Sequence, residues 1–288
     1  MPSRRAVLGA LVSGLASTAG CQAEDGSSEE TTATTTTRTT PTTDSTSTTE
    51  TTTSTTPRQP VPVFDGREGV IVVNGYSTSK LWPDFLQRKL DRYFGGRVLY
   101  VDTAIEAGTP IAKWMDPDTG APKAPWNETL APALDRERPV VVLGQQSLQF
   151  AFGPRTEGID GPDDGTDIER GADVLERYAR ALLEAGATAA FVATHIYKDP
   201  LEPLIGNERL ALEAVLQRDV RGLVRGPDVW KPTKAHYPAV YKSDGVHPNE
   251  AGAEIMAHHW FRRFLESDGQ AVPAWSSREM DAAIDESR

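Results

Sequence analysis

The sequence predicts an α/β domain in which a parallel sheet of about five strands is covered by helices on both faces. Short apolar runs such as 69–74 alternate with longer segments such as 168–185, whose apolar residues recur every three or four positions. Short apolar runs are typical of strands buried on both faces, and the periodic segments are typical of amphipathic helices. Their alternation indicates parallel strands joined by helical crossovers.

The predicted elements follow one another from residue 69 to residue 265, with no internal repeat. Apolar runs bounded by turn residues predict strands over 69–74, 97–101, 140–143 and 189–193, with a brief fifth strand at 228–230. Helical spacing predicts helices over 81–93, 168–185, 207–223 and 251–265, and the last of these begins after Asn249, a favourable N-cap. Residues 104–127 and 231–243 are predicted loops at strand ends, where open parallel sheets carry their sites.

Residues 1–21 are predicted to be an export signal. Arg4 and Arg5 precede a short apolar stretch that is too rich in Gly and Ser for a stable membrane span, which is typical of a twin-arginine signal. The small residues before Cys21 are similar to a lipobox, which predicts lipidation of Cys21 and anchoring on the outer face of the membrane. The alternative is an ordinary cleaved signal with an incidental cysteine. Cys21 is the only cysteine, so no disulfide and no thiolate metal site is expected in the mature chain.

The rest of the chain divides by composition into a linker, a folded domain and a tail. Residues 22–60 are dominated by Thr and Ser and have nothing to bury, so they are predicted to be a disordered linker, either O-glycosylated or plain. Residues 61–267 hold the predicted domain, and 268–288 are predicted to be a polar, frayed tail.

Charge restricts the partners of the domain. The net charge of the chain is −11, and about −9 of it lies beyond residue 59, because residues 1–59 hold four Arg and six Asp or Glu. A surface this acidic argues against nucleic acid and against an anionic membrane face as electrostatic partners. Contact with a membrane is therefore expected only through a lipid anchor.

Two short motifs hold the groups of a hydrolytic site. Ser77 follows the first strand in a Gly-x-Ser pattern, and Asp244 stands three residues before His247, just ahead of the last helix. A serine hydroxyl needs a base to take its proton, and an imidazole needs a carboxylate to fix its tautomer. Taken singly, Ser77 could be a helix N-cap, and the Asp-x-x-His pattern could be a turn held by local hydrogen bonds. Together they predict a Ser-His-Asp triad.

These motifs resemble those of the SGNH (GDSL-type) hydrolases over most of residues 69–265. The resemblance implies a flavodoxin-like three-layer α/β/α fold, with Ser77 as nucleophile and Asp244 and His247 completing the triad. It also implies an oxyanion hole made of the Ser77 and Gly108 N–H groups and the Gln146 side-chain amide. The chain departs from the family pattern at Tyr76, where the family has aspartate, and at Gln146, where it has asparagine.

The function predicted from these residues is hydrolysis of a carboxylic ester, such as an acetylated glycan or a lipid ester, by an exported enzyme without metal or organic cofactor. Tyr76, Trp114, Trp126 and His195 are candidate substrate contacts. For His195 a buried, satisfied polar group is the alternative, and for the tryptophans it is core packing. Two other functions are left open, namely a non-catalytic surface binding protein on the same scaffold and an acyltransferase.

Overall fold

The computed structural model describes residues 64, 68–153, 158–159 and 165–288. All described residues belong to one compact unit, Thr56–Arg288. The predicted signal, Cys21 and the predicted linker lie outside the described residues.

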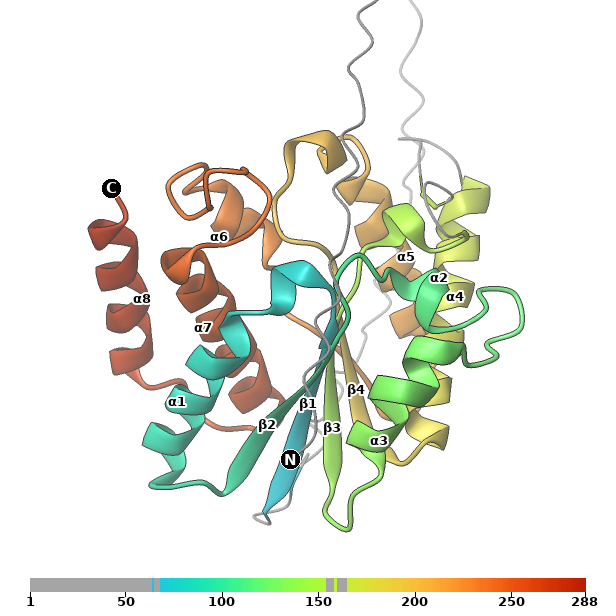
Figure 1. The fold of residues 1–288 in the computed structure, drawn as a ribbon, viewed down its shortest axis with the longest axis horizontal. Helices are drawn as coiled ribbons and strands as arrows, with labels where there is room; N and C mark the ends of the chain where they lie inside the picture. Colours follow the sequence, from blue (N-terminus) through green and yellow to red (C-terminus); the bar gives the residue numbers. More distant parts are fainter. Residues whose placement is uncertain (1–63, 65–67, 154–157, 160–164) are drawn as a thin grey trace, which may run out of the picture. The chain divides into compact units, whose positions relative to one another are not determined.

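Five parallel strands form one sheet in the order β2-β1-β3-β4-β5 (Figure 1). Their bounds are β1 Gly69–Gly75, β2 Leu99–Ile105, β3 Val140–Gln145, β4 Ala187–Ala193 and β5 Leu223–Arg225. This order is that of the flavodoxin-like doubly wound sheet, so the predicted fold class is confirmed. Strand order reverses at β1, and a crevice therefore opens at the carboxyl ends of the central strands.

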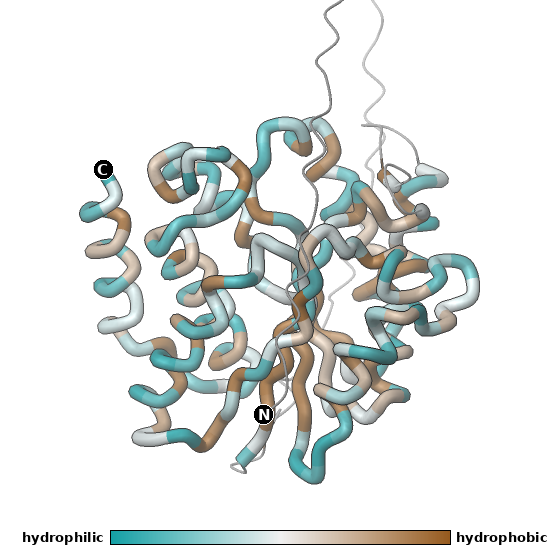
Figure 2. The backbone as a smooth tube through the Cα atoms, in the orientation of Figure 1, coloured by the Kyte–Doolittle hydropathy of each residue, from teal (hydrophilic) through white to brown (hydrophobic). Residues whose placement is uncertain are grey.

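The central strands β1 and β3 are buried on both faces because they are apolar along most of their length, with polar side chains only near their carboxyl ends, at Asn74 and Gln145. All seven residues of β1 are buried. Ile71 and Val73 pack into the core on one face of the sheet, and Val70 and Val72 pack into the core on the other. The alternation follows from the two-residue period of a strand. Figure 2 shows the same pattern as apolar strands inside a shell of more polar helices.

Helices cover both faces of this sheet and make three layers (Figure 1). One face carries α1 (Trp82–Phe94) and α7 (Glu250–Ser267), and the other carries α3 (Ala131–Leu134), α4 (Gly165–Glu184) and α5 (Ile205–Gln217). The connections hold short helices, namely η1 (Ser77–Ser79), α2 (Ile111–Trp114), η2 (Trp126–Leu130), η3 (Leu148–Phe150), η4 (Asp199–Leu201) and α6 (Trp230–Lys234). Within the described part of the chain, no helix is both long and apolar enough to cross a bilayer.

The predicted fifth strand at 228–230 is wrong. Asp228 Oδ1 accepts the N–H of Trp230 at 3.1 Å, and Trp230 begins the short helix α6. The fifth strand lies earlier, at β5, which begins at Leu223, the last residue of the helix predicted over 207–223. Helix α5 ends at Gln217, and Asp219 follows with a φ of 52°, so the chain turns and Leu223 pairs with Ala190 of β4.

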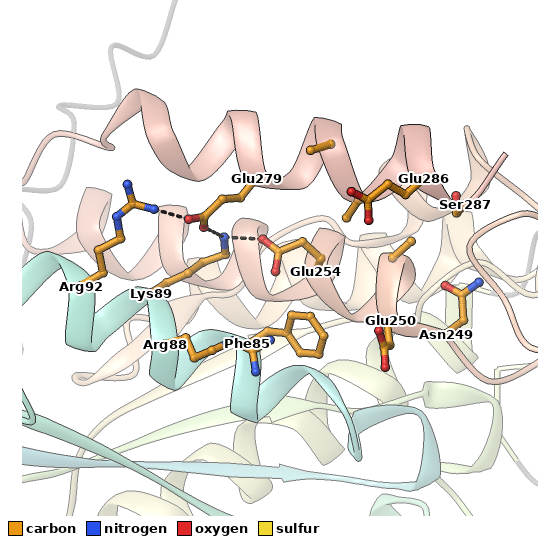
Figure 3. A pocket seen from close by; sticks show the side chains of 13 residues that line it. Phe85, Arg88, Lys89, Arg92, Asn249, Glu250, Glu254, Glu279, Glu286 and Ser287 are labelled. Atoms are coloured by element: carbon orange, nitrogen blue, oxygen red, sulfur yellow. Dashed lines mark hydrogen bonds and ion pairs between the residues drawn. The ribbon is translucent and has the colours of Figure 1, made fainter.

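The predicted frayed tail is also wrong, because Ala274–Glu286 form helix α8. The ring of Trp275 lies 5.7 Å from that of Phe261 on α7, and Ile284 is buried. The buried ammonium of Lys89 on α1 contacts Glu254 of α7 and Glu279 of α8 (Figure 3). A polar sequence therefore forms an ordered helix, because its few apolar residues and one carboxylate have partners far away in the chain.

Candidate active site

A cavity of about 370 Å³ opens at the carboxyl ends of the strands. The connection that follows each of the first four strands contributes to it: Tyr76 follows β1, Gly108 follows β2, Ser147 follows β3 and His195 follows β4. The loop before α7 adds His247. The other residues that line the cavity are Ser77, Thr78, Thr109, Pro110, Lys113, Gln149, Phe150, Lys198 and Val246.

Ser77, His247 and Asp244 form one chain of hydrogen bonds at the wall of this cavity. The distance from Ser77 Oγ to His247 Nε2 is 2.9 Å, and that from His247 Nδ1 to Asp244 Oδ2 is 2.8 Å. With the proton of the imidazole on Nδ1, which donates to the carboxylate, Nε2 is free to accept the proton of the serine. The two predicted motifs therefore meet with the geometry of a nucleophile, a base and an orienting carboxylate.

A rigid turn holds the acid and the base. Asp244 Oδ1 accepts the N–H groups of Val246 and His247, each at 2.9 Å. These two backbone bonds, with the His247 side chain on Oδ2, hold the pKa of Asp244 well below its usual range. The predicted cap follows at once, since Asn249 Oδ1 accepts the N–H of Gly252 at 3.0 Å and starts α7. Asp244 is therefore ionised at neutral pH and fixed relative to its imidazole.

Ser77 is placed by a close approach that requires glycine. A Cβ on Gly75 would lie 2.5 Å from Ser79 Oγ, so a larger residue would force apart strand β1 and the short helix η1. Ser77 is the first residue of η1, and the first N–H groups of a helix have no acceptor within it. The Ser77 N–H is therefore available to an oxyanion beside its own hydroxyl.

Gly108 supplies a second donor in the predicted position. It lines the cavity with a φ of 66°, a left-handed conformation that glycine adopts without strain. Among the described residues, its N–H has no hydrogen-bond acceptor. Two of the three predicted oxyanion donors thus belong to the cavity wall.

The third predicted donor, the Gln146 amide, does not lie in the cavity. Gln146 is 1% exposed, and its Nε2 donates to Asn74 Oδ1 at 2.9 Å. The same Asn74 oxygen accepts the Tyr178 hydroxyl, and Asn74 Nδ2 donates to Ala104 O at 2.9 Å. Gln146, which follows β3, is therefore hydrogen-bonded to Asn74 of β1, and Asn74 is in turn bonded to β2 beneath the site. Gln149, three residues later, lines the cavity instead.

Two of the four candidate substrate contacts line the cavity. The rings of Tyr76 and His195 lie 5.2 Å apart, and both residues belong to the wall. Burial lowers the pKa of His195 to about 4 and raises the pKa of Tyr76, so both side chains are neutral at pH 7. His195 Nδ1 also contacts the carbonyl oxygen of Ile196. The wall beside Ser77 therefore has a neutral aromatic surface.

Trp114 and Trp126 are not substrate contacts. They are 0% and 3% exposed and belong to the core on the face of the sheet covered by α3 and α4. The segment 104–127, predicted to be a loop, folds into α2 and the start of η2, and these turn both indoles inward. The prediction for both tryptophans is therefore wrong, because this connection contributes its own side chains to the core.

Sequence reasoning missed several residues of the wall, because none of them is itself part of a recognised motif. Those with polar side chains are Thr78, Thr109, Lys113, Ser147, Gln149 and Lys198. Their position directly after strands β1 to β4 was the one signal that could have found them.

A carboxyl group lies buried behind the cavity wall. Glu208 of α5 is 1% exposed, and its Oε1 accepts Ser147 Oγ at 3.1 Å and the N–H groups of Leu148 and Gln149 at 3.0 and 3.2 Å. Burial nevertheless outweighs these bonds and raises the pKa of Glu208 to about 7. Glu208 thus anchors the β3 connection, and it does so with a group that titrates near neutrality.

The stability of the protein should therefore fall as the pH rises from about 4.5 to about 7. A carboxyl whose folded pKa is raised stabilises the fold below its unfolded pKa, and this contribution is lost as the pH rises through the folded pKa. At about 1.4 kcal/mol per pH unit, the loss between pH 4.5 and about pH 7 is at most about 4 kcal/mol. Urea midpoints measured from pH 4.5 to pH 8 should fall in the wild type and stay flatter in Glu208→Gln.

Glu213→Gln is the matched control for that change. Glu213 lies on the same helix, but Arg225 lowers its pKa, so its replacement should leave the fall in stability intact. Equal slopes in wild type and Glu208→Gln would contradict the assignment.

A larger cavity, of about 690 Å³, lies between α1, α7 and α8 (Figure 3). Its charged groups face one another: Lys89 and Arg92 contact Glu279, and Lys89 also contacts Glu254. It has no nucleophile beside a base, so the smaller cavity is the candidate active site. Across the residues that the structure describes, no group of three or more His, Cys, Asp or Glu side chains is arranged to hold a metal ion.

Comparisons with known proteins give matches at the level of structure only. No protein-family model and no curated protein matches the chain. TesA matches with 18% identity and a TM-score of 0.45 over 69% of this chain and 99% of its own. A lipase/acylhydrolase from Enterococcus faecalis matches with 18% identity and a TM-score of 0.44 over 70% of this chain and 96% of its own. An acetyl esterase mutant with acetate ion matches with 13% identity and a TM-score of 0.48 over 70% of this chain and 98% of its own. Matches this distant leave the function to be argued from the site itself.

Proposed function

We propose that this protein is a serine hydrolase of the SGNH type that cleaves a carboxylic ester. The observation that carries the proposal is the continuous hydrogen-bonded series from Ser77 Oγ through His247 to Asp244, at 2.9 and 2.8 Å. It lies on the wall of a cavity, beside the available N–H groups of Ser77 and Gly108. Nucleophile, base, orienting group and oxyanion donors thus converge on one place.

The reaction follows from the position of each proton. Ser77 Oγ attacks the acyl carbon while His247 Nε2 takes its proton, and the N–H groups of Ser77 and Gly108 stabilise the oxyanion. His247 then gives this proton to the alcohol oxygen as the ester C–O bond breaks, which leaves an acyl group on Ser77. Water attacks that acyl group with His247 again as base, and the acid and the free serine are formed. Asp244 stabilises the imidazolium in both steps.

The place of action proposed for the enzyme is the outer face of the cell. The twin-arginine pattern and the lipobox-like residues before Cys21 support export and a lipid anchor, and the Thr-rich residues 22–60 would hold the domain away from the membrane. The net charge of −11 supports neither nucleic acid nor an anionic membrane surface as partner. The substrate would then be an extracellular small-molecule or glycan ester.

The proposal is tested by labelling with a fluorophosphonate and by turnover of p-nitrophenyl esters of rising acyl length. The wild type should be labelled at Ser77 and should release p-nitrophenol, and Ser77→Ala should do neither. Ser79→Ala is the matched control, because Ser79 lies on the same short helix but is fully buried. A wild type that is neither labelled nor active on any ester would make the chain a binding protein. An ester product formed with an added alcohol acceptor would instead favour the acyltransferase.

A further inference from the structure

The charged side chains of the active-site cavity are of one sign. Lys113 and Lys198 line it, and no Asp or Glu does so among the described residues. This differs from the chain as a whole, which has 41 acidic and 30 basic residues and only eight lysines. Acidic side chains do line other cavities, for example Glu250 and Glu286 in the cavity between α1, α7 and α8, and Glu266 in a third cavity beside Arg225 and Lys231. The cavity of the triad is therefore a locally positive place on an acidic protein.

Neither lysine is neutralised by a neighbour. In the part of the chain that the structure describes, no carboxylate lies within ion-pair distance of Lys113 or Lys198. Lys113 Nζ donates to the carbonyl oxygen of Gly108 at 2.9 Å, which places its ammonium on the loop that holds an oxyanion donor. Lys198 follows β4 on the side of His195, and its charge contributes to the lowered pKa of that imidazole.

The other polar groups of the wall do not cancel these charges. Tyr76 and His195 are neutral at pH 7. Two carboxyl groups lie near the wall without lining it, the half-exposed Asp244 and the buried Glu208, and both accept hydrogen bonds from protein donors. Asp244 accepts hydrogen bonds from the His247 ring and from two backbone N–H groups. Glu208 accepts hydrogen bonds from the Ser147 hydroxyl and from two other backbone N–H groups. Among the residues that the structure describes, the two ammonium groups are thus the charges of the cavity wall that a bound molecule would meet.

We infer that the ester cleaved at this site carries a negative charge of its own, such as a carboxylate, on its acyl or its alcohol group. This inference rests on the proposed esterase function and adds the class of its substrate. An anionic ester is repelled by a surface that carries about nine excess negative charges, and a local positive cavity overcomes that repulsion. A neutral lipid or acetyl ester would gain nothing from two unpaired lysines in the wall.

Matched pairs of chromogenic esters test this. The acyl-side pair is the p-nitrophenyl monoester of glutaric acid against p-nitrophenyl valerate, and the alcohol-side pair is 3-carboxy-4-nitrophenyl acetate against p-nitrophenyl acetate. The measured quantity is the ratio of kcat/KM for the anionic ester to that for its neutral partner. In the wild type at low salt, this ratio should exceed one in at least one pair and should fall as NaCl is added.

Lysine variants locate the cause of the preference. Lys113→Gln and Lys198→Gln should each lower the ratio by about fivefold, the effect of one partly exposed charge pair. Lys80→Gln, an exposed lysine that does not line the cavity, should leave the ratio as in the wild type. Turnover of neutral esters with ratios at or below one in both pairs, or an equal fall in Lys80→Gln, would overturn the inference and leave the esterase standing. A wild type that cleaves none of the four esters would defeat the proposed function itself.

Discussion

His247→Ala is expected to lower kcat for ester hydrolysis by at least about 10⁴-fold, because it removes the base that is hydrogen-bonded to Ser77 Oγ. The fold should survive, since the side chain is partly exposed and its backbone bonds to Lys242 and Asp244 remain. The measurement is the steady-state rate on the best p-nitrophenyl ester, with the thermal midpoint recorded alongside.

The double variant Ser77→Ala/His247→Ala makes this prediction sharper. Groups that act as one unit are not additive, so the double variant should be no slower than either single variant. His236→Ala is a matched control, because His236 precedes the same loop but does not line the cavity, and its activity should stay within a few-fold of the wild type. Losses that multiply in the double variant would mean that Ser77 and His247 act in separate steps.

The triad could be predicted from the sequence because its parts are local. Asp244 and His247 are three residues apart in one turn, and Ser77 directly follows an unmistakable strand. In a parallel sheet, the carboxyl ends of the strands share one edge, so two short motifs were sufficient to bring all three groups together. Gly108, which the resemblance to the SGNH hydrolases implies as an oxyanion donor, follows β2 and lines the same cavity.

The orientation of Gln146 could not be predicted, because distant residues decide it. Its amide lies under the site since Asn74 and Tyr178, on a strand and a helix far apart in the chain, form a buried polar cluster whose Asn74 oxygen accepts the Gln146 N–H. A buried polar group left without a partner costs about 1–3 kcal/mol, which is enough to choose a side-chain rotamer. Helix α8 was missed for a similar reason, as its polar sequence is ordered only by contacts with α1 and α7.

Asp244→Asn is expected to lower kcat by about 10⁴-fold at neutral pH while leaving the turn intact. The asparagine oxygen can still accept the N–H groups of Val246 and His247, as Oδ1 of the aspartate does. Its amide, however, donates where Oδ2 accepted, so the imidazole must turn Nδ1 into an acceptor and carry its proton on Nε2. A protonated Nε2 cannot take the proton of Ser77.

Asp244→Ala distinguishes the loss of the tautomer from the loss of the turn. Alanine removes the acceptor of both backbone N–H groups, so this variant should lose both activity and thermal stability, whereas Asp244→Asn should lose activity alone. The comparison uses kcat measured near neutral pH and the thermal midpoint of unfolding, both determined for each variant. Activity of Asp244→Asn close to that of the wild type would show that the carboxylate only shapes the turn, and the imidazole would then have to be oriented by some other group. None of the described residues other than Asp244 and Ser77 makes a side-chain hydrogen bond to that ring, so the loss of activity is the outcome that the geometry requires.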